Sequence, residues 1–241
     1  MPIQVQGNSG TVYEVGPNTR ANRAEERPID VEGLGAYQMA VTSGTMAAGL
    51  GAAAPIFSAR WGDVSRTALI RRVALLAQNA GTAFAAGLFT FDMVVARAFT
   101  VSDSAQTSVL PVGHNQKKRT SFGTTLFTDL RISATATITA GTRTLDAQPL
   151  SVVKGAIPAT ATNFVFVPAA GQPMTAAAAA ATGVFGSRPV DLWSPEIGNS
   201  WPLVLVQNEG FIIRATVPAT GTWLFVVEME WAEVLNTAGY N

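Results

Sequence analysis

The sequence predicts an all-β protein of antiparallel strands with little helix, and three observations carry this prediction. A length of 241 residues suits a single β-sandwich or barrel. Short segments that alternate apolar and polar side chains recur along the chain, and clusters of Gly, Pro and Asn separate them. The clearest alternation, with a period of two, covers residues 211–217 and 223–231.

Strands are expected where apolar and polar residues alternate, or where β-branched and aromatic residues dominate. The segment 67–78 also fits a helix, and we favour a strand because its neighbours are all β. Helix propensity clearly wins only in residues 175–182, six Ala flanked by Thr, which we expect to form a turn or two of helix or a loop. The expected strands are 11–15, 36–41, 55–61, 67–78, 88–99, 122–139, 151–153, 163–167, 202–206, 211–217 and 223–231.

The last of these strands is the expected centre of the core. Its alternate residues Trp223, Phe225 and Trp231 place three large aromatic side chains on one face. Glu228 and Glu230 emerge on the other face. A strand with one aromatic and one acidic face is typical of a sheet that covers a core on one side only.

Short turns connect the last three predicted strands. Residues 207–210 contain Asn and Gly, which tolerate positive φ, and residues 218–222 have the composition of a hairpin loop. Because consecutive strands joined by such turns usually pair with each other, we expect an antiparallel meander at the C-terminal end.

The first 32 residues are expected to form an extended N-terminal arm, and residues 33–241 a single β domain. Within the arm, residues 19–28 mix charges and contain no apolar side chain larger than Ala before Pro28. Such a segment cannot supply much core of its own, so it is either disordered or laid across a neighbouring subunit. Its charged residues are interface candidates: Arg20, Arg23, Glu25, Glu26 and Arg27.

Charge is sparse and unevenly distributed. Charged residues make up 13% of the chain, against roughly 25% in ordinary soluble proteins, so much of the surface is expected to be covered by protein. The alternative is a monomer whose exterior is Thr, Ser, Asn and Gln. Residues 60–131 hold nine basic and four acidic side chains (+5), whereas residues 190–241 hold one basic and six acidic (−5). These charges can pair within one fold or between copies.

The sequence offers little for catalysis or metal binding. It has no cysteine and one histidine, His114, which is expected at the surface of a polar, basic loop. It contains neither a Gly-x-Ser-x-Gly elbow nor a Gly-rich phosphate loop. Glu228 and Glu230 do not form a calcium-loop pattern, and we interpret them as a solvated or interface-facing pair rather than a glycosidase pair. We therefore expect no enzyme, no cofactor and no metal.

The basic run Lys117, Lys118 and Arg119 is expected in a solvated loop or in a salt bridge to an acidic neighbour. No aromatic residue is interleaved with it, which makes it a weak nucleic-acid contact, and a formal net charge of zero also argues against a specific nucleic-acid partner. Together with Glu228 and Glu230, the run completes the interface candidates.

No membrane partner is expected. The longest apolar stretches, residues 46–57 and 83–96, are too short and too often interrupted to span a bilayer. Residues 1–6 lack the basic and apolar regions of a signal peptide. These features predict a soluble protein that is made in a cytoplasm.

The C-terminal part of the chain resembles virion proteins of tailed bacteriophages. The resemblance rests on residues 208–213 feeding a hairpin into residues 223–233, on an Ala-, Thr- and Gly-rich middle, on the absence of cysteine, and on the arm before Pro28. It implies a β-sandwich of the jelly-roll type, formed by residues 33–241, that assembles as a homo-oligomer, a trimer being favoured. No catalytic residue is implied.

The role implied by this resemblance is that of a capsid decoration or cement protein, which stabilises the head by bridging neighbouring subunits. Its partners would be copies of itself and major capsid or other virion proteins, and its location the virion, assembled in the host cytoplasm. Such a protein needs broad, neutral, complementary surfaces rather than a concave polar pocket. The alternatives are a tail or head-fibre or adaptor component, a host-surface carbohydrate-binding module, and a hydrolase.

Overall fold

The chain forms two compact units, residues 1–33 and residues 34–241. The boundary falls next to the expected end of the arm at residue 32. The structure is a computed structural model, and it describes residues 4–6, 12–14, 35–46, 50, 52–82, 85–112, 117–118, 122–157, 189–194 and 202–235.

The first unit contains a small antiparallel β-hairpin. Strand β1 (Gln4–Gln6) pairs with β2 (Val12–Glu14) in a register that places Val5 opposite Tyr13. β2 lies inside the strand expected at residues 11–15, whereas β1 was not predicted. The charged segment 19–28 lies outside the described residues.

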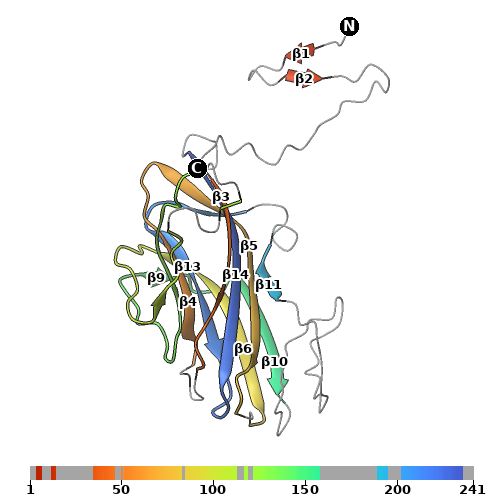
Figure 1. Cartoon of the computed structure of the whole chain (residues 1–241), viewed down its shortest axis with the longest axis vertical. Coiled ribbons are helices and arrows are strands. Elements are labelled where there is room, and N and C mark those ends of the chain that lie inside the picture. The colour runs from red at the N-terminus through yellow and green to blue at the C-terminus, as the bar shows by residue number, and fades with distance from the viewer. Residues whose placement is uncertain are drawn as a thin grey trace. The chain divides into compact units, whose positions relative to one another are not determined.

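The second unit is a β-sandwich, in which two antiparallel sheets pack against each other (Figure 1). Among the described residues there is no helix, so none is long and apolar enough to cross a membrane. The all-β prediction is confirmed. The strands expected near residues 36–41, 55–61, 67–78, 88–99, 151–153, 202–206, 211–217 and 223–231 all form, with ends that differ by a few residues.

One sheet has seven strands and the other has five. The seven-stranded sheet has the order β10 (Ser151–Ile157), β6 (Gly87–Arg97), β13 (Glu209–Thr216), β4 (Ala54–Trp61), β8 (Phe127–Ile132) and β7 (Thr107–Ser108), with β9 (Thr144–Leu145) also pairing β6. The five-stranded sheet has the order β11 (Val190–Trp193), β5 (Arg66–Asn79), β14 (Trp223–Leu235) and β3 (Ala36–Thr42), with β12 (Leu203–Leu205) also pairing β5.

The segment that also fitted a helix is the long strand β5. It pairs with β14 along its whole length, in a register that shifts at a bulge between Glu230 and Trp231. Val73 and Leu75 are buried opposite Met229 and Val227. Pairing with the long apolar strand β14 therefore determines the strand conformation of a segment whose local pattern fits a helix as well.

The core is aromatic, and both sheets contribute to it. Trp231 stacks on Tyr37 at 5.2 Å between ring centroids and meets Phe127 edge-on at 5.4 Å. Phe225 of β14 meets Phe91 of the opposite sheet edge-on at 5.8 Å. The prediction that the aromatic face of β14 is buried is confirmed, since its inward side chains are at most 1% exposed: Trp223, Phe225, Val227, Met229 and Trp231.

The predicted C-terminal meander is wrong, because β13 and β14 belong to different sheets. β13 pairs with β4 and β6, and β14 pairs with β3 and β5. Ile213 faces the core and Ile212 is buried on the other side of the same strand. A strand that is apolar on both faces suits the middle of a sheet, and residues 217–222 cross from one sheet to the other instead of closing a hairpin.

The alternating series at residues 133–139 is also not a strand. β8 ends at Ile132, and beyond it only Thr139 forms an isolated bridge, to Ser104. Ser133 and Ile138 are nevertheless buried, so this segment is packed as an irregular covering. The strand expected at 163–167 and the Ala run at 175–182 lie outside the described residues.

Candidate interaction surface

The interface candidates that the structure describes gather on one side of the sandwich. Glu228 and Glu230 lie on the outer face of β14, and Lys118 forms an ion pair with Glu230. The Lys117 ammonium donates to the Phe122 carbonyl at 2.6 Å. The other candidates, which are Arg20, Arg23, Glu25, Glu26, Arg27 and Arg119, lie outside the described residues.

Arg72 joins three strands on this outer face. Its Nε donates to Asp191 Oδ1 of β11 at 2.6 Å, and its Nη1 donates to Glu228 Oε2 of β14 at 2.7 Å. The three side chains are between 28% and 36% exposed, so solvent screens the pairs and their stabilising effect is small. The arrangement neutralises the acidic face of β14 from within the chain.

The two oppositely charged segments of the sequence pair with each other inside the fold. Arg97 pairs with Glu209, Arg72 with Glu228, and Lys118 with Glu230. The sequence left open whether these charges meet within one chain or between copies, and the structure shows that these pairs are internal. The charges of Glu228 and Glu230 are therefore already compensated within the chain, whereas Arg71 on β5 is exposed.

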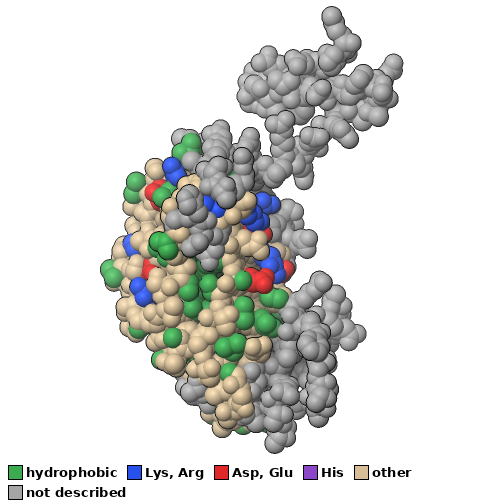
Figure 2. Space-filling view, viewed as in Figure 1, with side chains coloured by type: hydrophobic (Ala, Val, Ile, Leu, Met, Phe, Trp, Pro, Cys, Tyr) green, Lys and Arg blue, Asp and Glu red, His purple; other side chains and the backbone are tan. Residues whose placement is uncertain are grey.

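An apolar band runs beside the ion pairs on the five-stranded sheet. The register places Val226 of β14 between Leu76 of β5 and Thr42 of β3, and all three point away from the core. Leu224 lies one step further along the same face. Figure 2 shows hydrophobic side chains gathered along the middle of this face, with acidic and basic side chains at its margin.

A buried carboxylate, which was not among the residues predicted from the sequence although it continues the inward face of β14, lies at one end of the sandwich. Glu233 is 0% exposed, and its Oε1 accepts from Thr125 Oγ1 at 2.6 Å, Leu126 N at 3.0 Å and Trp231 Nε1 at 3.3 Å. Its Oε2 has no hydrogen-bond partner among the described residues. Burial raises the pKa of Glu233, although these hydrogen bonds act against the shift.

Glu233 and Tyr37 together hold residues 122–126 against the sandwich. The Tyr37 hydroxyl donates to the Gly123 carbonyl at 2.8 Å, next to the Thr125 and Leu126 contacts of Glu233. Burial and the nearby Glu233 carboxylate raise the pKa of Tyr37 to about 12, against the lowering effect of Arg66. These two groups form a polar clasp inside an otherwise apolar end.

We expect Glu233→Gln to change how stability depends on pH. Because the folded-state pKa is raised, the protonated carboxyl favours the fold at low pH, and this contribution is lost as the pH rises through the folded-state pKa. The Gln variant keeps an acceptor for Thr125 and does not titrate. Urea unfolding at several values from about pH 4 to pH 8 should show the variant gaining stability relative to the wild-type protein as pH rises. A constant difference across that range would contradict the assignment.

A second polar cluster lies under a lobe on the outer face of the seven-stranded sheet, formed by residues 98–106 and 133–147. Arg60 of β4 donates to the carbonyls of Phe99 and Thr100 at 2.6 and 2.9 Å and to Ser102 Oγ at 3.1 Å. Within the lobe, Asp103 and Arg143 form an ion pair whose side chains are 0% and 5% exposed. Hydrogen bonds from Arg60 thus hold the lobe on the outer face of the sheet, and the ion pair of Asp103 with Arg143 is buried within the lobe.

The lobe also holds strained backbone. Ala98, Ala105 and Gln106 have φ values of 47°, 58° and 62°, in a left-handed region that residues other than Gly rarely adopt. Arg143 lies over the Phe99 ring at 5.3 Å, and Phe99 packs with Ile212 and Ala96 in a small second core. Sequence reasoning missed this cluster because its members are far apart in the chain and follow no motif.

Comparison with known proteins gives no relative: no family model, no curated protein and no solved structure matches the chain. Among the residues that the structure describes, no group of three or more His, Asp or Glu could hold a metal ion. A function for this chain can therefore be inferred only from its own fold and surface.

Proposed function

We propose that the chain is a non-enzymatic structural component of a phage particle, in the first place a capsid decoration protein, and that its sandwich is a jelly roll. Strand order is the observation that carries this proposal. The comparison uses eight of the strands, which in chain order are β3, β4, β5, β6, β10, β11, β13 and β14. The five-stranded sheet has the order β3, β14, β5, β11, which are the first, eighth, third and sixth of these strands. The seven-stranded sheet has the order β4, β13, β6, β10, which are the second, seventh, fourth and fifth.

This order is the one that two interleaved Greek keys produce in a jelly roll. Jelly rolls are frequent in viral capsid proteins, and the step from fold to role is an analogy. The extra strands β7, β8 and β9 widen one sheet without interrupting the order. The arrangement agrees with the resemblance of residues 208–233 to phage virion proteins.

The character of the surface supports the same role. On the five-stranded face, Arg72 pairs with Asp191 and Glu228, and Lys118 pairs with Glu230, all within the chain. An apolar band lies beside these pairs. Elsewhere Leu88, Val64 and Val112 are 76%, 66% and 70% exposed. Neutral, apolar surface of this kind favours contact with protein, as expected of a molecule that bridges capsid subunits and associates with itself, for which we favour a trimer.

Counting copies on purified particles tests the proposal. The protein is measured by quantitative mass spectrometry in DNA-filled particles from the source of the sequence, relative to the major capsid protein. A fixed, high ratio to that protein is expected for head decoration. Absence from purified particles would contradict any virion role.

The main alternative, a fibre, adaptor or carbohydrate-binding component, is favoured by the same fold, since jelly rolls also occur in lectins. A fibre or adaptor would be present at a small multiple of the vertex number instead of a high ratio. Binding of the purified protein to host-surface glycans would support the carbohydrate-binding module.

A further inference from the structure

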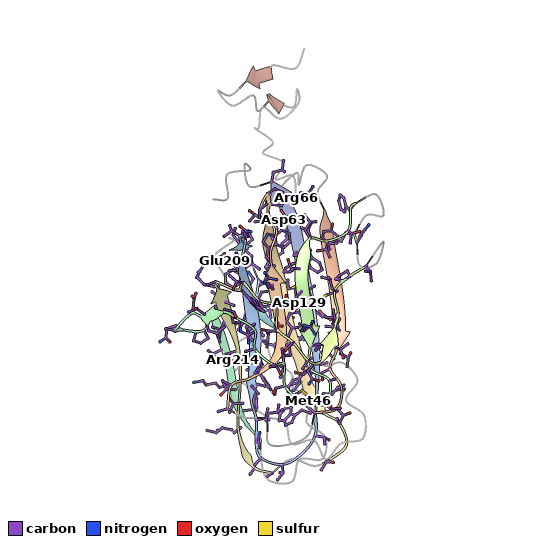
Figure 3. All side chains as sticks on the ribbon, turned by 90° about the vertical axis from the view of Figure 1, so that its left-hand side faces the viewer. Met46, Asp63, Arg66, Asp129, Glu209 and Arg214 are labelled. Atoms are coloured by element: carbon purple, nitrogen blue, oxygen red, sulfur yellow. The ribbon has the colours of Figure 1, made fainter. Side chains whose placement is uncertain are left out.

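A short segment that leads into β8 is fastened to one end of the outer edge of β3. It comprises residues 117–118 and 122–126, and we call it the strap. Lys117 forms an antiparallel bridge with Tyr37 of β3, and Lys118 N donates to Ala36 O at 2.9 Å. Figure 3 looks onto this side of the sandwich, with β3 at one margin and β8 beside it. The strap therefore occupies main-chain groups that an edge strand otherwise leaves open.

Two buried side chains of the sandwich hold the strap in place. The Tyr37 hydroxyl donates to Gly123 O at 2.8 Å. Glu233 Oε1 accepts from Thr125 Oγ1 at 2.6 Å and from Leu126 N at 3.0 Å. The strap itself belongs to no strand, so its attachment depends on a small number of hydrogen bonds. An element held in this way opens at a lower free energy than the sheets on which it rests.

With the strap docked, only a short part of the β3 edge is open. Ser43 N donates to a carbonyl of β14 at 2.7 Å, so the even-numbered residues of β3 direct their main-chain groups outward. At the far end, Gly44 N donates to Ser133 O at 3.1 Å. Between the strap and this contact, the outward main-chain groups of Ala40 and Thr42 have no partner among the described residues. This opening is shorter than a strand of usual length, which has about five to six residues.

The sequence of β3 does not itself discourage pairing with another strand. Exposed edges are usually protected by charge, proline or a bulge. β3 contains no charged residue and no proline, and it pairs with β14 in an unbroken register. If the strap opens, the outward main-chain groups from Ala36 to Thr42 become one continuous free edge. The strap therefore provides the protection that the residues of β3 lack.

We propose that the strap is an autoinhibitory contact, which while docked keeps a strand of a second copy from pairing with β3. Opening of the strap lengthens the free edge and permits that pairing. A second copy is the expected partner because β3 is uncharged and only 13% of the whole chain is charged, so strands of two copies meet with little like-charge repulsion. This device does not depend on the proposed virion role. Association of the wild-type protein, including the trimer favoured above, takes place with the strap docked and is the baseline for the test.

Removing two anchors of the strap in the full-length protein tests the proposal. Tyr37→Phe keeps the ring stack on Trp231 and removes the hydroxyl, whereas Thr125→Val keeps the shape of the side chain and removes its hydrogen bond to Glu233. Because each hydrogen bond changes the equilibrium between docked and open strap about fivefold, the double variant should raise the open population roughly twentyfold. Hydrogen exchange, followed by mass spectrometry of peptides that cover residues 122–126, measures this opening.

Sedimentation velocity at increasing protein concentration measures association. Because only the open state can pair, the double variant is expected to associate at a concentration roughly tenfold or more below that of the wild type. Ala40→Lys, added to the double variant, places a charge at the centre of the edge and should abolish this gain. The matched control Gln78→Lys places the same charge on the same outer face, on the neighbouring strand β5, and should leave the gain unchanged.

Three results would overturn the proposal: unchanged exchange of the strap, faster exchange without added association, or equal suppression of the gain by Ala40→Lys and Gln78→Lys. Tyr37→Phe alone is the milder variant and should give intermediate exchange and association, so the test does not require the double variant to fold. A high copy number on particles without the gain in association would retain the proposed role and remove this device. The gain without particle association would retain the device and remove the role.

Discussion

Replacing Phe225 by Ala is expected to lower the free energy of unfolding by about 3–5 kcal/mol. The Phe225 ring is 0% exposed, stacks on Trp223 at 5.8 Å and meets Phe91 of the opposite sheet at 5.8 Å. Its removal leaves a cavity between the two sheets that stiff aromatic neighbours cannot fill by small adjustments. Urea unfolding monitored by tryptophan fluorescence gives the difference.

Leu224→Ala is the matched control on the same strand. Leu224 points to the outer face and is only partly buried, so its loss should cost about 1 kcal/mol or less. Similar costs for the two variants, or an unchanged unfolding midpoint for Phe225→Ala, would contradict the inward assignment of the aromatic face.

The fold class could be predicted because alternation is a local property of the sequence. Along β14, a period of two and three large aromatic residues define the buried face without reference to any other strand. The same information does not say which strands pair. Phe211–Thr216 and Trp223–Trp231 both have an apolar face, and the short connection between them suggested a hairpin, whereas the two faces meet across the core from opposite sheets.

The candidate surface was predicted less well for a similar reason. Glu228 and Glu230 were correctly expected on one outward face, but their partners Arg72 and Lys118 are more than a hundred residues away in the chain. Sequence showed that opposite charges were available and could not show that they meet within one copy. Glu233 continues the odd-numbered, inward face of β14 that buries Trp231, but its hydrogen-bond partners Thr125 and Leu126 are more than a hundred residues away in the chain, so the sequence could not show what satisfies it.

Replacing Asp103 by Ala is expected to lower the free energy of unfolding by about 3–5 kcal/mol, because it leaves the buried guanidinium of Arg143 without its counter-ion. Asp103 Oδ1 also accepts from Gly141 N at 2.8 Å, so the substitution removes a main-chain contact of the lobe as well. The lobe contains three residues with positive φ, and their strained conformation persists only while the surrounding contacts hold it.

The double variant Asp103→Ala with Arg143→Met separates the orphaned charge from the loss of packing. Met keeps an apolar side chain over the Phe99 ring, where Arg143 lies at 5.3 Å, and removes the unpaired charge. Replacing both members of a buried ion pair by apolar residues is often close to neutral, so the double variant should recover most of the stability lost in Asp103→Ala. Urea unfolding of the two variants measures this recovery. A double variant no more stable than Asp103→Ala would mean that the hydrogen bond to Gly141, and not the ion pair, holds the lobe on the sheet.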